Sequence, residues 1–306
     1  STPNRLIVHI DKITKQISTK SEEIRGPNIK SPDKALEGFL RSNNIEKSKI
    51  FIKKTEKGDF YFYKKSSQKI SAAELLRKNI PKILSNITWD KSMKWGDNNL
   101  FWGRPLKSIL SVFDGKKLDF KFNHLKSSNT TFIDKELEDR TKSFNSFKSY
   151  NSFFKNLGIL IDQEKRKSFI SNEIIKLSTK KKLNIDLEKK LLDEITNIVE
   201  KPKILLCEFD KKYLMIPKEI LIITMQSHQK YFPTFDNKQN LTNNFIVVAD
   251  KKDPKGFVKL GNERVIEARL NDAEFFWKKN RSQNLVKQVS KLKNINYFKG
   301  LGSYFD

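Results

Sequence analysis

One histidine lies in a stretch whose neighbours could support acid–base chemistry. His228 stands beside Gln229 and Lys230 in the segment MQSHQKYFPTFD, and it is one of three histidines in the chain of 306 residues. A histidine acts as a general base near neutral pH when a carboxylate orients its ring. Glu219 and Asp236 could do so if the fold brought them close. The alternative is a structural role, in which a histidine near a helix end bonds to the backbone.

The sequence offers no second group that would complete a catalytic centre. His9, His124 and His228 have no histidine or cysteine partner at metal-ligand spacing, so we predict no metal site. The sequence has no glycine-rich phosphate loop and no serine in a nucleophile elbow. We therefore predict that no residue of this chain is catalytic, and that His228 and Gln229 are structural.

The segment GNERVIEARLNDAEFFWKKN, residues 261–280, has the clearest helical pattern. Its residues Ile266, Leu270, Ala273 and Trp277 recur at helical spacing and predict one apolar stripe. We expect a helix from Asn262 to about Lys279, with Gly261 allowing a sharp entry, and Trp277 as part of the structure.

Charged residues flank that stripe and leave two interpretations open. Arg269 and Asp272 are three residues apart and could form a structural ion pair at its edge. Alternatively, Arg264 and Arg269 contact RNA or another subunit. Lys230 and Arg104 are the other two candidates for such contacts.

The net charge of the chain predicts an anionic partner. It carries 61 Lys and Arg against 36 Asp and Glu, a formal charge of +25. Such an excess favours nucleic acid, through salt-sensitive attraction to phosphates. Ten of the basic residues are arginine and the rest lysine, so a compositional bias of the coding DNA is the alternative explanation.

The apolar segments indicate a protein of the reducing cytosol. No apolar run is long enough to span a membrane, and we find no signal peptide. Cys207, the single cysteine, lies in the run ILLCEF and is predicted to be buried. Both ends of the sequence resemble cuts through a longer protein.

Short strands and amphipathic helices follow one another without regular βαβ alternation. We predict a strand over residues 5–13, a hairpin around Gly58–Asp59, and two strands around DNKQN at residues 236–240. This order indicates a multi-domain α+β fold of short mixed strands and hairpins packed with amphipathic helices. The expected domains are an α+β domain over 1–88, a Trp-rich connecting segment over 89–142, and an α+β domain over 143–306.

Several long segments resemble one protein family. ILIITMQSHQKYFPTFD, followed by GNERVIEARLNDAEFFWKKN, is similar to the beta subunit of the bacterial heterotetrameric glycyl-tRNA synthetase. TEKGDFYFYKK, GRPLKSILSVFDG and LLDEITNIVEKP match in the same order along nearly the whole chain. The chain resembles the N-terminal portion of that subunit. The loop at residues 125–135 departs from the family pattern.

The resemblance implies a non-catalytic subunit. In that family the alpha subunit activates glycine with ATP and Mg²⁺, and the beta subunit supports tRNA(Gly) recognition and assembly. We therefore expect this chain to bind no cofactor itself, and to have the alpha subunit and tRNA(Gly) as cytoplasmic partners. Two other hypotheses remain: a stand-alone basic RNA-binding module, and a hydrolase that uses His228.

Overall fold

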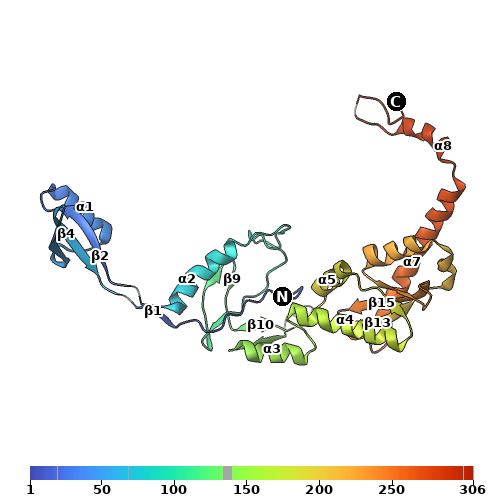
Figure 1. Ribbon diagram of the computed structural model, residues 1–306, viewed down its shortest axis with the longest axis horizontal. Coiled ribbons are helices and arrows are strands. Elements are labelled where there is room, and N and C mark those ends of the chain that lie inside the picture. Colours follow the sequence, from blue (N-terminus) through green and yellow to red (C-terminus); the bar gives the residue numbers. More distant parts are fainter. Residues whose placement is uncertain (19, 68, 134–139, 299, 306) are drawn as a thin grey trace. The chain divides into compact units, whose positions relative to one another are not determined.

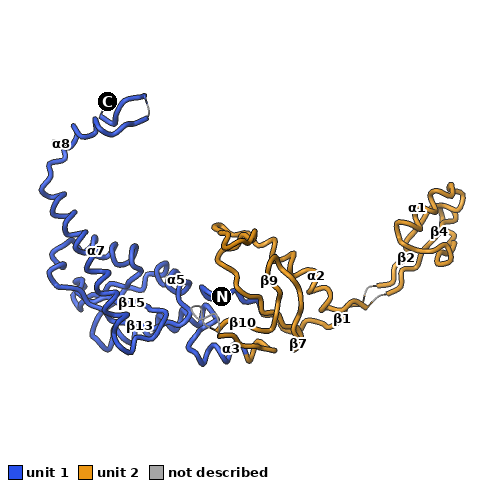
Figure 2. Tube along the Cα trace, turned by 180° about the vertical axis from the view of Figure 1, so that it is seen from behind, with its two compact units in different colours: residues 1–8, 150–306 blue, residues 9–149 orange. Residues whose placement is uncertain are grey.

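The computed structural model describes residues 1–18, 20–67, 69–133, 140–298 and 300–305. They form two compact units, which we call the 9–149 unit and the 150–306 unit; the second also includes residues 1–8 (Figure 2). Both units combine helices with small antiparallel sheets, which confirms the predicted α+β class (Figure 1). The division into 1–88, 89–142 and 143–306 stays a prediction.

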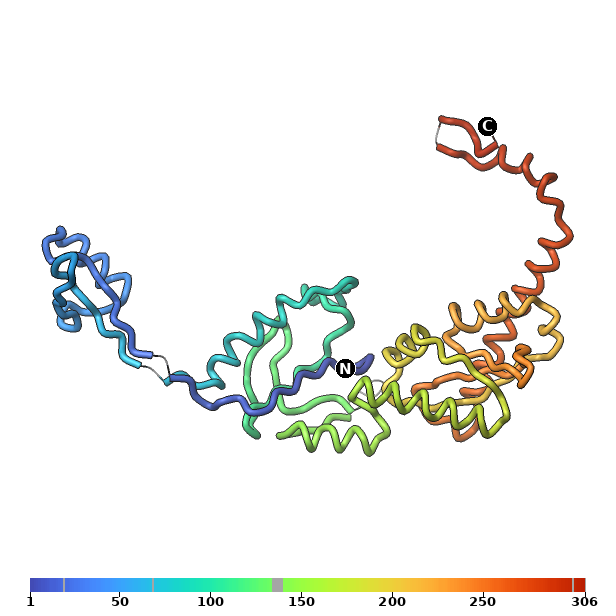
Figure 3. Tube along the Cα trace, in the orientation of Figure 1, coloured from blue at the N-terminus to red at the C-terminus, as the bar shows by residue number. Residues whose placement is uncertain are grey.

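The 9–149 unit contains a small βαββ module, residues 22–65 (Figure 3). Strands β2 (Glu22–Asn28), β4 (Gly58–Lys65) and β3 (Ile50–Thr55) form an antiparallel sheet in that spatial order. Gly58 has a φ of 111°, a conformation that favours glycine, and opens β4 directly after the turn. This confirms the hairpin predicted around Gly58–Asp59. The module is completed by helix α1 (Asp33–Asn43) and 3-10 helix η1 (Lys47–Lys49).

The rest of this unit surrounds an aromatic core. Trp102, Leu118, Phe120 and Phe122 are buried there, and side chains of helix α2 (Ala72–Ser85) pack against them. The strands are short and pair in antiparallel fashion: β1 (Gln16–Ser18) with β5 (Lys69–Ser71), β6 (Val112–Phe113) with β7 (Lys116–Lys117), β8 (Lys121–Phe122) with β9 (Leu125–Lys126), and β10 (Thr130–Phe132) with β11 (Thr141–Ser143).

The 150–306 unit is built on one antiparallel sheet whose two faces are both covered. The spatial order is β12 (Asn184–Ile185), β14 (Phe232–Phe235), β15 (Leu241–Ala249) and β13 (Lys203–Glu208). Successive side chains of a strand point to opposite faces. Accordingly, Phe245 and Val247 of β15 belong to one core cluster, and Ile246 belongs to the other.

Helices cover both faces of this sheet. Helices α4 (Gln163–Lys180) and α5 (Lys189–Ile198) supply apolar side chains to the cluster around Ile246. Helices α6 (Lys218–Ile223) and α7 (Phe257–Ser282) supply them to the cluster that contains Cys207, which is buried as predicted. The remaining helical elements are α3 (Phe147–Asn156), η2 (Lys211–Met215), η3 (Thr224–Gln229), α8 (Leu285–Gln288) and η4 (Val289–Asn294). Within the described ranges, no helix is both long and apolar enough to cross a membrane.

The strand predicted over residues 5–13 is wrong. Leu6 and Val8 are 61% and 80% exposed, and the segment adopts no strand because no described strand pairs with it. β-branched residues favour a strand only where a neighbour supplies the ladder. Ser1 and Thr2, which precede this segment, are held by side-chain hydrogen bonds. Arg166 Nη2 donates to the Ser1 carbonyl at 2.9 Å, and Thr2 Oγ1 donates to Glu200 at 2.8 Å.

Candidate nucleic-acid interface

Helix α7 carries two of the predicted contact residues and begins earlier than predicted. It starts at Phe257, because Gly256 adopts a φ of 74° and Asp253 caps the first turn. The Asp253 carboxylate accepts from Val258 N at 3.0 Å and Lys259 N at 2.8 Å. Burial raises the pKa of Asp253, but these N–H donors outweigh it and hold the pKa below its ordinary value. Gly261 therefore lies inside the helix, and its predicted role as the entry is wrong.

The inner face of α7 is the predicted apolar stripe. Ile266 and Leu270 are fully buried against the sheet, and Trp277 is half-buried against the same cluster. Polar contacts flank the stripe: Tyr231 Oη donates to Asn262 Oδ1 at 2.7 Å, and Tyr213 donates similarly from η2. The helix is thus fixed along its length by burial and by tyrosine hydrogen bonds.

Arg264 and Arg269 lie on exposed parts of this helix. Neither forms an ion pair with a residue that the structure describes, and the ion pair that we considered between Arg269 and Asp272 is not formed. Phe275 and Phe276 of the same helix are 60% and 56% exposed. A helix that carries both exposed guanidinium groups and exposed aromatic rings suits either an RNA strand or another protein surface.

Lys230 lies at the end of an unusual helical turn. Helix α6 continues into the π-helical segment η3, which closes through a 2.9 Å bond from Tyr231 N to the Met225 carbonyl. Lys230 then adopts a φ of 61°, which ends the helix. Its ammonium group forms an ion pair with Glu194 of α5 at 2.9 Å. Lys230 therefore links the end of η3 to α5 through a partly exposed ion pair, and an anionic partner would have to compete with Glu194.

His228 is exposed on this π-helical segment. Gln229 is half-buried next to it. Within the described part of the chain, the His228 ring makes no hydrogen bond, neither to the backbone as the structural alternative expects nor to a carboxylate. No three His, Cys, Asp or Glu residues among those described are grouped to hold a metal ion. The role of His228 stays a prediction.

The two remaining sequence predictions fall in the 9–149 unit. Arg104 is exposed in the Trp-rich segment. The altered loop at 125–135 forms β9 and β10, and the Ser127 hydroxyl is buried between them, where it accepts from Phe120 N at 2.7 Å. Residues 134 and 135 of that loop lie outside the described residues.

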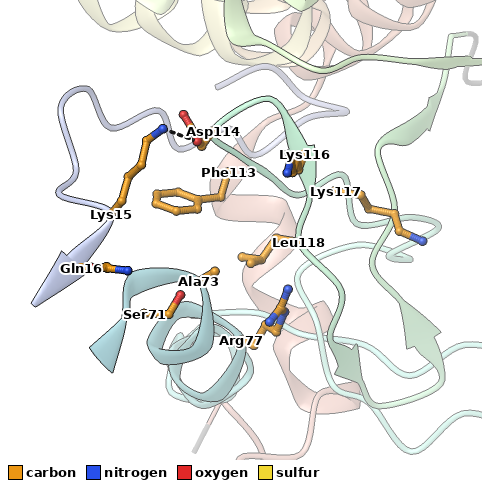
Figure 4. Close-up of a pocket in the computed structure, with 10 residues that line it drawn as sticks. All are labelled: Lys15, Gln16, Ser71, Ala73, Arg77, Phe113, Asp114, Lys116, Lys117 and Leu118. Carbon is orange, nitrogen blue, oxygen red and sulfur yellow. Dashed lines mark ion pairs between the residues drawn. The ribbon is translucent and has the colours of Figure 1, made fainter. Parts of the chain in front are cut away.

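A basic pocket in the 9–149 unit was not predicted from the sequence. It has a volume of about 310 Å³ and lies between β1, the start of α2 and the hairpin β6–β7. In Figure 4 the Phe113 ring extends from the hairpin toward Lys15 and Gln16, while Arg77 comes from α2. Asp114 and Gly115 have φ of 50° and 74°, values typical of the two-residue turns that close hairpins.

The pocket has more positive than negative side chains. It is lined by Lys15, Arg77, Lys116 and Lys117, against the single carboxylate Asp114. Lys15 pairs with Asp114 at 2.7 Å, whereas Arg77 and Lys116 form no ion pair with a described residue. A guanidinium and an ammonium group at a half-open pocket can bind phosphate oxygens. The pocket could not be predicted from the sequence, because Arg77 is far along the chain from the DGKK turn at residues 114–117, which lines the same pocket.

A family model and curated relatives both match this chain to the same protein family. The family model described as glycyl-tRNA synthetase beta subunit matches residues 1–306. The chain is 32% identical over 302 residues to the glycine–tRNA ligase beta subunit of Rickettsia akari, and 33% identical over 306 residues to that of Rickettsia typhi. Each alignment covers 98% of this chain but 46% of the relative. The chain thus spans about half the length of the curated relatives it matches.

Proposed function

Because the chain belongs to the family of glycyl-tRNA synthetase beta subunits, we propose that it supports tRNA(Gly) binding and assembles with a catalytic alpha subunit. The alpha subunit activates glycine with ATP and Mg²⁺, and this chain contributes no catalytic residue and binds no cofactor. Its place of action is the cytoplasm. The observation that carries the proposal is the family match over residues 1–306, which leaves no part of the chain to another kind of protein.

Two features support the RNA-binding part of the proposal. The first is the charge of +25, which attracts phosphates from any direction. The second is the presence of exposed cations without an ion-pair partner among the described residues, namely Arg264 and Arg269 on α7, and Arg77 and Lys116 at the pocket. Each contact with a single-stranded or duplex phosphate should contribute a slope of about −0.7 to −0.9 to log affinity against log salt.

Assembly with an alpha subunit is supported by the apolar surface of α7. Phe257 is 69% exposed, and Phe275 and Phe276 are more than half exposed, although Ile266 and Leu270 of the same helix are fully buried. Phe275 and Phe276 are in contact with each other, and exposed aromatic side chains of this kind are typical of protein–protein interfaces. We take this surface as the first candidate for the contact with the alpha subunit.

Reconstitution tests the proposal. The purified chain should show no ATP–pyrophosphate exchange alone, and it should co-elute with a separately purified alpha chain in size-exclusion chromatography. It should also bind tRNA(Gly) with an affinity that falls steeply with salt. Exchange activity of the chain alone, or failure to co-elute, would contradict the assignment. RNA binding without co-elution would instead support the stand-alone RNA-binding module.

A matched pair of variants tests the pocket. Arg77→Ala should weaken tRNA binding and reduce the salt slope by about 0.7 to 0.9, the value of one phosphate contact. Lys78→Ala removes the same charge from the neighbouring exposed position of α2 and should leave both quantities near wild type. Equal effects of the two variants would indicate that only the overall charge matters.

A further inference from the structure

The βαββ module has one sheet face on which aromatic and charged side chains alternate. Directly paired residues of neighbouring strands share a face. The register pairs Phe62 of β4 with both Arg25 of β2 and Phe51 of β3, and it pairs Phe60 with Lys53. We call this surface the open face; its residues are Arg25, Phe51, Lys53, Phe60, Phe62 and Lys64. Phe62, on the central strand, is buried, whereas Arg25, Phe51 and Lys53 are exposed.

Helix α1 covers the opposite face of the sheet. Gly26 follows Arg25 and therefore points the other way, and the Phe39 ring of α1 lies only 2.9 Å from where a Cβ of Gly26 would be. On the open face, an ion pair of 2.6 Å links Lys53 on β3 to Glu23 on β2, and so crosses the central strand β4. Both side chains of this pair remain 51% and 40% exposed, so they are at the surface.

The open face offers two flat groups on which a base could stack. The Phe51 ring is 38% exposed, and its centre lies 6.2 Å from that of Phe62 with 27° between the ring planes. The Arg25 guanidinium lies 3.6 Å above the centre of the Phe60 ring, and Arg25 is itself exposed. A guanidinium held flat on one ring can stack a second planar group on its outer side.

The charge of the open face complements a phosphate backbone. Arg25, Lys53 and Lys64 are positive, and Glu23 is the one carboxylate paired into this surface in the described register. The exposed Phe51 ring among these cations suits unpaired nucleotides, because bases inside a duplex cannot present their flat sides to a ring. A protein partner would gain less from this surface, since protein interfaces are depleted of Lys at their centre.

We propose that the open face of the βαββ module binds unpaired nucleotides of RNA. Phe51 and Arg25 stack bases, and Lys64 contacts a phosphate; a phosphate at Lys53 has to compete with Glu23. This inference rests on the proposed function in taking RNA as the partner. It adds that this part of the chain recognises single-stranded RNA, whereas the charge of the chain attracts any nucleic acid.

Fluorescence anisotropy with the full chain tests the proposal. The probes are a labelled single-stranded RNA of about ten uridines, a length within the usual site size of such surfaces, and a blunt RNA duplex of similar length. Phe51→Leu keeps an apolar side chain but removes the ring, and Arg25→Lys keeps the charge but removes the flat guanidinium. Each should weaken single-strand binding by roughly 5- to 100-fold, the range for one stacked base, with little change for the duplex.

The control variant is Ile52→Ala, which alters a 57% exposed residue of β3 on the opposite face and should bind like wild type. Circular dichroism melts confirm that every variant is folded. The proposal is overturned if Phe51→Leu and Arg25→Lys bind the single strand like wild type, or if they weaken duplex binding equally. It is also overturned if Phe51→Leu weakens only the binding to the alpha chain, because the open face would then be a protein contact.

The same samples separate this inference from the proposed function. Co-elution with the alpha chain and salt-sensitive tRNA(Gly) binding by the wild-type chain test the family role. The ratio of single-strand to duplex affinity in the variants tests the open face. A chain that passes the first set and shows no change in the second retains its proposed function and loses only this inference.

Discussion

The buried arginine of α4 allows one prediction to be worked through in detail. Arg166 is fully buried, yet no carboxylate among the described residues is in direct contact with its guanidinium. It donates instead to backbone carbonyls: Nε to Thr196 at 2.9 Å, Nη1 to Leu160 at 2.5 Å, and Nη2 to Ser1 at 2.9 Å. Burial lowers the pKa of Arg166, an effect that the nearby Glu200 opposes. The perturbation is Arg166→Met, which removes the charge and all of these bonds but keeps a long side chain.

Two opposing effects decide the magnitude. Each hydrogen bond from a charged donor contributes about 1.5–3 kcal/mol, and a buried carbonyl left without a partner costs about 1–3 kcal/mol. The substitution also removes the cost of burying a charge away from water, and this gain offsets part of the loss. We expect Arg166→Met to lower the free energy of unfolding by roughly 2–4 kcal/mol. Arg166→Ala should cost about 3–5 kcal/mol, because it also leaves a cavity.

Hydrogen exchange measured by mass spectrometry is the suitable assay, because it reports each unit separately. Peptides from α4 and α5 should exchange faster in both variants, while peptides from α2 keep their wild-type rates. Lys165→Met, at the neighbouring exposed position, is the matched control and should change stability by less than about 0.5 kcal/mol. If Arg166→Met is as stable as wild type, desolvation of the charge outweighs its hydrogen bonds and our reasoning is refuted.

The remaining predictions concern the core and the cap of α7. Burial raises the pKa of Cys207 to about 12, so a thiol reagent at pH 8 should label it only when the chain is unfolded, and rapid labelling under native conditions would contradict this. Asp253 has a lowered pKa in the folded state, so its cap stabilises at pH values above its unfolded pKa of about 3.9 and is lost as pH falls through the folded pKa. In Asp253→Asn, the free energy of unfolding should depend less on pH in this acidic range, as measured by melts at several pH values. Trp277→Ala should destabilise by roughly 2–4 kcal/mol, below the value for a fully buried tryptophan, whereas exposed Arg269→Ala should cost about 0–0.5 kcal/mol in denaturant melts.

Sequence patterns identified features that depend on local spacing. The stripe through Ile266 and Leu270 and the hairpin at Gly58 were predictable, because helical period and turn chemistry are properties of neighbouring residues. The prediction of a strand at residues 5–13 was wrong, because a strand needs a partner strand that the local sequence does not specify. The start of α7 was missed because its cap, Asp253, stands before Pro254 and outside the apolar pattern.

Long-range features were beyond prediction from one sequence. The basic pocket joins Arg77 of α2 to a hairpin far along the chain, and the open face requires the register of three strands. The ion pair of Lys230 with Glu194 is of the same kind. Of the candidate contact residues, the helical position of Arg264 and Arg269 was predictable from spacing, whereas only the structure shows that neither has an ion-pair partner among the described residues.

The 150–306 unit is discontinuous in sequence, and this has a consequence for the order of folding. Its sheet is assembled from residues 184–249, so these contacts form between segments close in the chain. The bonds from Ser1 to Arg166 and from Thr2 to Glu200 instead close loops with sequence separations of 165 and 198 residues. Closing a loop of that size costs roughly 4–5 kcal/mol of chain entropy. During synthesis, residues 1 and 2 can therefore dock only after α4 and α5 have emerged, more than 150 residues later in the chain.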